Sequence, residues 1–401
     1  MSCRSPRTRL SALGVTLALA LVSACSSAPG NDSSEPEGDT SQVSKTSQAK
    51  ILSNIRRGAQ KVDIERKVKL RVQSGTFETV QVTGPKGAII KGRLSPDKTR
   101  WVSNTQLQAA SRYRITSTAV DSESVKNSFE SAFRTRKLSL EEQTYPSFVP
   151  TDGQTVGVGM PVVIRFDVPV ANQASIERHL KVTSQPAQVG AFHWISSQEV
   201  HWRPKNYWRP GTDVTVKADI GGVPAGNGIY GQLDRTQKFH VGDAMVSKVD
   251  MNSHQMRVFR NGKLIRNIPI TTGEQPKFTT RSGIKVISEK HRTKRMNSET
   301  IGIDPESADG YDLDDVEYAM RVTNSGEFVH AAPWSVGDQG NANVSHGCTG
   351  MSTANAEWLY NNSKVGDVVQ YVGTDRGMDL TNGFGDWNAS FPDYRAGSAL
   401  S

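Results

Sequence analysis

The chain has little cysteine, with three among 401 residues, at positions 3, 25 and 348. So few thiols cannot build the disulfide framework that stabilises many exported domains. No CxxC pair or HExxH motif is present, so the standard zinc signatures are missing. The formal net charge of +8 is modest, and no basic patch with interleaved aromatic side chains accompanies it. These absences argue against a disulfide scaffold, a structural metal site and a nucleic-acid partner.

A long membrane-spanning run is also missing, because the apolar stretch from 10 to 24 holds about 15 residues where a bilayer needs about 20. Arg4, Arg7 and Arg9 precede it, and Val22-Ser23-Ala24-Cys25 ends it, which looks like a bacterial lipobox. We therefore expect a signal peptide at 1–24, cleavage before Cys25 and acylation of that cysteine. The protein would be extracytoplasmic and lipid-anchored to the outer face of the cell membrane. An ordinary secreted protein cleaved nearby is the alternative.

Residues 25–50 lack aromatic side chains, and their only branched aliphatic residue is Val43. Such a segment cannot bury enough apolar surface to fold alone, so the composition predicts a flexible linker behind the lipidated cysteine.

The rest of the chain is predicted to be mainly β. Short alternating runs broken by Gly, Pro and Asn indicate two immunoglobulin-like β-sandwich domains, at 51–145 and 146–243. Three tryptophans of the second block are expected in its core or at a domain interface rather than in a sugar site: Trp194, Trp202 and Trp208.

A third, β-rich block covers 244–373. Asn261-Gly262, between two alternating runs, predicts a hairpin, because both turn positions favour positive φ. A short helix is expected to begin at Ser352 or Thr353. The last segment, 374–401, carries Phe384, Trp387, Phe391 and Tyr394, too many aromatic side chains for a free tail. We expect it to dock on the body.

Cys348 would be the only free thiol of the mature body if Cys25 is acylated. A lone thiol outside the cytoplasm is explained by deep burial or by use as a nucleophile. His330 and His346 lie shortly upstream, and in an extended segment positions 346 and 348 point the same way. Either histidine could act as the base, and the dipole of the following helix is expected to favour the thiolate. A buried structural cysteine beside a core histidine, and a Cys-His-His zinc site, remain alternatives.

The backbone around the cysteine adds two expectations. Gly347 lets a substrate or a strained turn approach the sulfur. The N–H groups of 347 and 348 are candidates for an oxyanion hole.

His330 followed by Ser345-His346-Gly347-Cys348 resembles the signature of the YkuD-type L,D-transpeptidases. Together with the lipobox, the tandem immunoglobulin-like domains and the GDWN sequence near the C-terminus, it resembles the actinobacterial, mycobacterial-type lipoproteins of that family. The resemblance implies a peptidoglycan enzyme without a cofactor. Cys348 would take the acyl group of a donor tetrapeptide stem as a thioester, release D-Ala, and pass it to an acceptor stem as a 3→3 cross-link.

The resemblance also implies individual roles. Cys348 would be the nucleophile and His330 the base, oriented by the carbonyl of Ala331, with His346 shaping the motif. The remaining positions implied to bind substrate are Tyr311, Ser325, Gly326, Ser345, Gly347 and Gly350. Carbapenem-type β-lactams would be inhibitors. The segment 271–298 lies where the family carries a lid over the cleft, although an ordinary long hairpin would look the same.

Gly350 departs from the family pattern, in which Asn or Arg usually stands two residues after the cysteine. A glycine cannot bind polar groups of the stem there. An L,D-carboxypeptidase and a non-catalytic wall-binding lipoprotein therefore stay open. Papain-like peptidases place the cysteine before the histidine, and sortases need an arginine soon after it, whereas here the first is Arg376.

Overall fold

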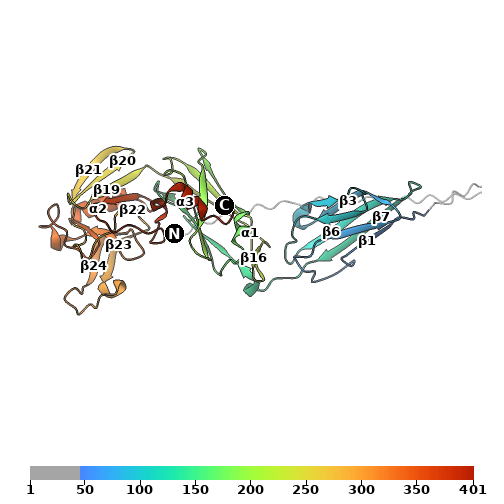
Figure 1. Ribbon diagram of the computed structural model, residues 1–401, viewed down its shortest axis with the longest axis horizontal. Helices are drawn as coiled ribbons and strands as arrows, with labels where there is room; N and C mark the ends of the chain where they lie inside the picture. The colour runs from blue at the N-terminus through green and yellow to red at the C-terminus, as the bar shows by residue number, and fades with distance from the viewer. Residues whose placement is uncertain (1–45) are drawn as a thin grey trace, which may run out of the picture. The chain divides into compact units, whose positions relative to one another are not determined.

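Residues 46–401 are described by the structure, a computed structural model (Figure 1). The predicted signal peptide and the lipidation site at Cys25 lie outside these residues. Residues 46–50, which composition assigned to the linker, belong to the folded body, because Lys50 pairs with Gln73 and the Gln48 amide donates to Asp121 at 2.9 Å. Composition cannot reveal such backbone pairing. Within residues 46–401, no helix is long and apolar enough to cross a bilayer.

The first region contains two sheets that enclose one apolar core. One sheet has the order β1(Lys50–Ser53), β2(Lys69–Gln73), β5(Arg100–Ser103), β4(Gly92–Leu94). The other has the order β3(Thr76–Thr83), β6(Arg112–Val120), β7(Lys126–Arg134). Two short 3-10 turns are η1(Pro85–Gly87) and η2(Leu140–Glu142).

The second region repeats the two-sheet arrangement around a second core. One sheet has the order β13(Gly190–Trp194), β14(Glu199–Pro204), β11(Val162–Phe166), β9(Pro146–Val149). The other has the order β10(Thr155–Val156), β18(Arg235–Val241), β15(Asp213–Ala218), β12(Leu180–Gln185). The remaining elements are the sheet β16(Pro224–Gly226), β17(Ile229–Gly231), β8(Gln143–Thr144) and the helix α1(Gln173–Glu177). Trp202 and Trp208 are buried in this core and Trp194 packs against it, as expected.

The third region, yellow to orange in Figure 1, packs two sheets around a core to which helix α2 contributes. The five-stranded sheet has the order β21(Lys263–Pro269), β20(Gln255–Arg260), β19(Met245–Asp250), β27(Val368–Val372), β22(Gly283–Val286). The four-stranded sheet has the order β23(Glu289–Asn297), β24(Asp312–Arg321), β25(Phe328–Ala331), β26(Thr349–Met351). The remaining elements are η3(Ser298–Ile301), η4(Pro333–Ser335) and α2(Thr353–Asn362).

The local sequence signals of this region are confirmed. Asn261 and Gly262 have φ of +50° and +81° between β20 and β21, as the hairpin requires. Ser352 caps α2 by accepting a hydrogen bond from the Asn355 amide. The segment 271–298 is not one separate flap, because β22 joins the five-stranded sheet and β23 pairs with β24.

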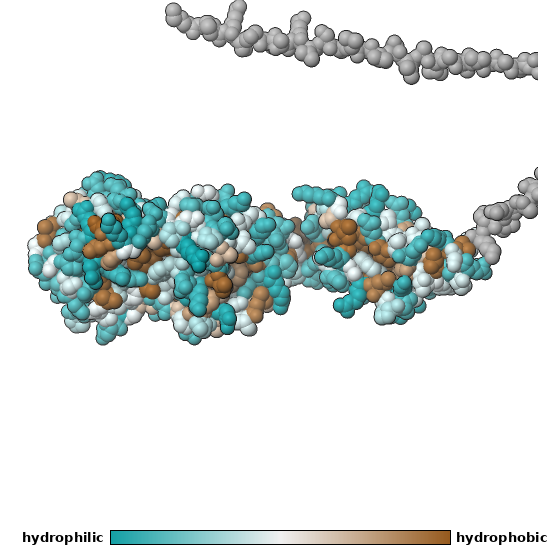
Figure 2. Space-filling model, turned by 90° about the horizontal axis from the view of Figure 1, so that it is seen from above, coloured by the Kyte–Doolittle hydropathy of each residue, from teal (hydrophilic) through white to brown (hydrophobic). Residues whose placement is uncertain are grey.

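The C-terminal segment contains η5(Asp386–Asn388) and α3(Phe391–Ala396), and it packs through aromatic side chains. Phe384 and Trp387 share the apolar cluster of the second region, where the Trp387 indole donates to the Gly159 carbonyl at 2.7 Å. Tyr394 is fully buried. The fold class is therefore the one the sequence predicted: mainly β, with a short helix after Cys348. Figure 2 shows that the surface in view is mainly hydrophilic, with separate apolar patches.

Candidate active site

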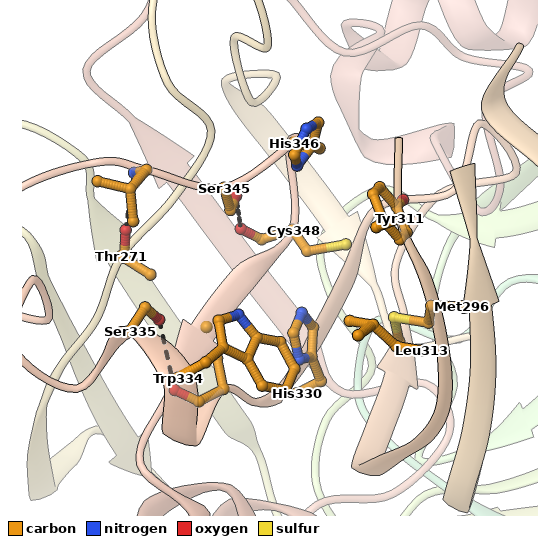
Figure 3. A pocket seen from close by; sticks show the side chains of 13 residues that line it. Thr271, Met296, Tyr311, Leu313, His330, Trp334, Ser335, Ser345, His346 and Cys348 are labelled. Carbon is orange, nitrogen blue, oxygen red and sulfur yellow. Dashed lines mark hydrogen bonds between the residues drawn. The ribbon is translucent and has the colours of Figure 1, made fainter. Parts of the chain in front are cut away.

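A parallel strand pair brings the two candidate catalytic residues together. His330 lies on β25, Cys348 directly precedes β26, and the register sets His330 opposite Gly350. Since side chains alternate along a strand, His330 and Cys348 lie on the same face of this sheet. Both line a cavity of about 330 Å³ (Figure 3).

The cavity has a wall on each side of the sulfur. Met296, Tyr311 and Leu313 form one wall, from the end of the β23–β24 hairpin and the turn within it. Trp334 and Ser335 of η4, with Thr271, form the other. The cavity therefore extends to both sides of the sulfur.

The Cys348 thiol contacts the backbone of the turn that precedes β25. The Phe328 N–H donates to Sγ at 3.4 Å, and the thiol donates to the Gly326 carbonyl at 3.6 Å. Burial raises the pKa of the Cys348 thiol to about 11, and the Phe328 N–H opposes that shift. Burial is therefore the dominant influence on this thiol, and the net shift does not favour the thiolate as the helix was expected to do. The thiol is neutral near pH 7, so attack needs a base.

His330 lines the same cavity and has the tautomer that a base there would need. Its Nδ1 donates to the Ala331 carbonyl at 2.7 Å, which leaves Nε2 unprotonated in the neutral ring. Its ring stacks on Trp334, with the centroids 6.0 Å apart. Burial lowers the pKa of His330 below its ordinary value of 6.5, so the ring is neutral near pH 7. The carbonyl does what the third member of a catalytic triad does: it fixes the ring and its tautomer.

His346 occupies a different environment. It lies between the rings of Phe278 and Tyr311, with centroid distances of 4.3 and 5.1 Å. The segment 346–348 does not have the extended geometry that would point both side chains the same way, because Gly347 has φ of +121° and turns the chain there. This conformation strongly favours glycine. The contacts of the His346 ring with Phe278 and Tyr311 make it part of the lining of the cavity.

Hydrogen bonds of Ser345 close the turn that carries the cysteine. Its hydroxyl donates to the Cys348 carbonyl at 2.6 Å and accepts from the Gly347 N–H at 3.1 Å. The Gly347 carbonyl in turn accepts from Thr280 at 2.9 Å. The Gly347 N–H is therefore already engaged, so of the two amides expected in an oxyanion hole, Cys348 is the better candidate.

The other predicted binding residues divide into two groups. Tyr311, Ser345 and Gly350 line the cavity. Ser325 and Gly326 lie in the turn behind the sulfur, where the Ser325 hydroxyl accepts from Arg281 at 3.1 Å. Together with Ala331 and Gly347, they act on the site through backbone geometry.

Gly350 is enclosed by its neighbours. A Cβ there would lie 2.8 Å from the Ala332 Cβ and 3.1 Å from the Thr271 Cγ2. The Gly350 N–H and carbonyl bond to the Thr271 backbone, both at 2.9 Å, so the strand cannot easily move away. The departure from the family pattern therefore has a packing reason in this chain.

We expect Gly350→Ala to destabilise the protein by about 1–3 kcal/mol through overpacking. If the close contact did not exist, replacing this glycine of ordinary φ by alanine would stabilise the protein by about 0.4–1 kcal/mol. The sign of the change in unfolding free energy therefore tells whether the contact is real. Thermal unfolding measures the effect. In the Ala332→Gly background the close contact is absent, so adding Gly350→Ala there should cost less stability than it costs in the wild-type protein. A Gly350→Ala protein as stable as wild type would contradict this packing account.

Sequence reasoning missed several residues of this site. Trp334 is 59 % exposed beside His330, and the Pro-Trp pair that follows the His330 strand was the available signal. Met296 and Leu313 meet only through the register of β23 with β24, which the sequence does not show. Glu327 and Lys285, behind the sulfur, are a buried ion pair without a sequence signature.

Comparison with known proteins agrees with this geometry. Residues 245–370 match the family model of the L,D-transpeptidase catalytic domain (YkuD), and residues 59–224 match the Bacterial Ig domain. The chain is 36% identical to L,D-transpeptidase 2 of Mycobacterium tuberculosis over 87% of this chain and 85% of that protein. It is 39% identical to L,D-transpeptidase 1 of the same species, over 57% and 84%.

The solved structures include an LD transpeptidase in complex with imipenem. It superposes with a TM-score of 0.50 at 40% identity, and the match covers 56% of this chain and 97% of that one. From the sequence match over most of its length and the match of its third region to the catalytic-domain model, this chain is a member of the YkuD-type L,D-transpeptidase family.

Proposed function

We propose that this protein forms 3→3 cross-links in peptidoglycan through a thioester on Cys348. The observation that carries the proposal is the placement of Cys348 and His330 in one cavity, with the histidine oriented by the Ala331 carbonyl. Membership of the family favours transfer over the alternatives of an L,D-carboxypeptidase and a non-catalytic wall-binding protein.

The first half-reaction acylates the enzyme. Sγ of Cys348 attacks the carbonyl of the third residue of a donor tetrapeptide stem while its proton passes to Nε2 of His330. The tetrahedral intermediate collapses, its bond to the terminal D-Ala breaks, and the histidine returns the proton to the leaving amine. A thioester and free D-Ala result.

The second half-reaction passes the acyl group on. The side-chain amine of the third residue of an acceptor stem attacks the thioester, its proton passes to His330, and the cysteine leaves as the thiol. The two cavity walls suit two stems approaching from opposite sides of the sulfur. His346 and Tyr311 support the wall that faces one of them.

Carbapenem-type β-lactams are proposed inhibitors. The thiol would open the lactam ring as it attacks the donor carbonyl, and a similar LD transpeptidase was solved in complex with imipenem. The apolar cavity around the thiol can hold a ligand of that size.

The direct test supplies purified protein with disaccharide-tetrapeptide and follows the products by mass spectrometry. Dimers joined between third residues, with one D-Ala released per dimer, support the proposal. Tripeptide monomers alone would indicate a carboxypeptidase, and unchanged substrate a non-catalytic protein.

We also propose that the mature chain is a lipoprotein at the outer face of the cell membrane, because Val22-Ser23-Ala24-Cys25 resembles a lipobox. Multiple acyl chains on Cys25 would give stable anchoring. In cell fractionation, Cys25→Ala should move the protein out of the membrane fraction or leave it unprocessed. Wild-type protein in the soluble fraction would contradict the anchor.

A further inference from the structure

A buried ion pair lies behind the nucleophile, outside the cavity. Lys285 on β22 is fully buried, and its Nζ donates to a carboxylate oxygen of Glu327 at 2.5 Å. The other carboxylate oxygen accepts from the Arg281 side chain at 3.3 Å and from the Arg281 amide at 3.1 Å. Burial lowers the pKa of Lys285 to about 8, so the ammonium is charged at neutral pH.

Glu327 is flanked by the two residues that hold the sulfur. The N–H of Phe328 donates to Sγ and the carbonyl of Gly326 accepts from it. The Glu327 amide also donates to the Thr323 hydroxyl at 2.9 Å, so both the backbone and the side chain of this residue are fixed. The position of the Phe328 N–H on the sulfur therefore depends on where Glu327 is held.

Lys285 also reaches the other side of the cysteine. Its Nζ lies 3.8 Å from the centre of the Tyr371 ring, and the Tyr371 hydroxyl hydrogen-bonds the Thr349 hydroxyl at 2.8 Å. Thr349 follows Cys348 directly and is buried. Through Glu327 and Tyr371, Lys285 thus supports the backbone at 326–328 and at Thr349, on the two sides of Sγ.

Stability alone does not explain this pair. Removing two ions from water costs several kcal/mol each, and a buried pair is often no better than apolar residues of similar volume. Buried charges with perturbed pKa values cluster at functional sites, where they shape the reactive groups.

We propose that Lys285 and Glu327 are positioning residues that hold the Gly326–Phe328 backbone against Cys348, so that the Phe328 N–H stabilises the sulfur as its proton leaves. The inference rests on the proposed function of Cys348 as nucleophile. Neither side chain lines the cavity. They act through the backbone that they hold in place, which is preorganised before the reaction.

The test measures the reactivity of the thiol without any substrate. The full-length mature chain carries Cys25→Ser, which leaves Cys348 as its only thiol, and its alkylation rate with iodoacetamide is followed from pH 6 to 10. Glu327→Gln is the decisive variant, because two explanations predict opposite signs. If Glu327 acted only through its charge, removing it would lower the pKa of the thiol and speed alkylation, since the Glu327 charge raises that pKa.

If Glu327 positions the Phe328 N–H, the amide no longer stabilises the thiolate and alkylation slows. We expect it to slow about tenfold or more. Complete loss of one such donor costs about 10²- to 10³-fold, and a displaced donor costs less. Lys285→Met should slow it to a similar extent, and the double variant should be no worse than either single one, because both act on one turn. In the transpeptidase assay, kcat should fall while the donor KM stays within about twofold.

The matched controls are a buried carboxylate and a half-buried lysine elsewhere. Glu177→Gln removes the charge of the carboxylate that accepts from the Trp194 indole, and Lys290→Met removes a cation bonded to the carbonyls of Tyr360 and Ser363. Both should alkylate at the wild-type rate. Circular dichroism checks the fold. If Glu327→Gln does not fold, Glu327→Asp decides, because it keeps the charge but shortens the side chain: positioning predicts slower alkylation, whereas charge alone predicts the wild-type rate. Alkylation at the wild-type rate or faster in a folded Glu327→Gln or Lys285→Met variant overturns the positioning proposal. A wild-type protein that is alkylated normally but forms no cross-link overturns the proposed function instead.

Discussion

Cys348→Ala should lose D-Ala release and cross-link formation together, by about a thousand-fold or more, with no change in the fold. Both half-reactions pass through one sulfur, and removing the nucleophile of a covalent mechanism leaves only what binding and electrostatics can supply. Cys348 is the only free cysteine among residues 46–401, so no neighbouring thiol there can replace it.

The measurement follows free D-Ala and dimeric muropeptides over time for wild type and variant at equal concentration. Thermal unfolding is the control, because alanine in place of a part-buried cysteine should shift Tm by only a few degrees. Cross-linking at more than about a tenth of the wild-type rate in Cys348→Ala would show that the sulfur is not the acyl carrier.

Replacing His330 has the second largest expected effect. His330→Ala should lower the acylation rate at pH 7 by about 10²- to 10⁴-fold, the usual contribution of a positioned general base. The thiol with a pKa of about 11 is almost wholly protonated at pH 7, so attack without a base depends on a very small thiolate fraction.

The pH dependence gives this prediction a shape as well as a size. Burial lowers the pKa of His330, so the ring is already neutral at pH 6.5. The wild-type rate should therefore be independent of pH between about 6.5 and neutral pH. Below that pKa the ring is protonated and the rate falls. In His330→Ala the rate should instead rise about tenfold per pH unit toward the pKa of the thiol.

His346→Phe separates the two histidines that the sequence left open as the base. An aromatic ring at 346 keeps the packing between Phe278 and Tyr311 but cannot accept a proton. This variant should retain the level wild-type pH profile with a reduced rate. If instead the rate of His346→Phe rises about tenfold per pH unit and that of His330→Ala does not, His346 is the base.

The chemistry of the site could be read from the sequence because it rests on rare residues. Cys348 has few rivals, and two of only eight histidines stand close upstream of it. Short patterns also predict three local features. Asn-Gly predicts the hairpin, a serine before an apolar run predicts the helix cap, and the aromatic content of the C-terminal segment predicts that it docks on the body.

The geometry could not be read, because it depends on contacts between distant segments. The parallel pairing of β25 with β26 decides that His330 faces the cavity, and the positive φ of Gly347 decides that His346 takes a different direction. The sequence suggested a lowered pKa for the thiol, whereas burial, which no local pattern gives, raises it.

Gly350 illustrates the same limit. In the sequence it is only the loss of a polar side chain, whereas in the structure it is the residue that lets β26 lie between β25 and Thr271. Its neighbour Ala332 and the backbone bonds to Thr271 explain why a side chain is missing there.

The central claim is that Cys348 is an activated nucleophile that carries the acyl group, and covalent labelling tests it most directly. Folded wild-type protein is incubated with a carbapenem, and intact mass spectrometry followed by peptide mapping locates the adduct. We expect one adduct per chain on the peptide that contains Cys348, formed at a rate that falls in His330→Ala and absent in Cys348→Ala. No adduct on the folded wild-type protein, or one that persists in Cys348→Ala, would contradict the mechanism.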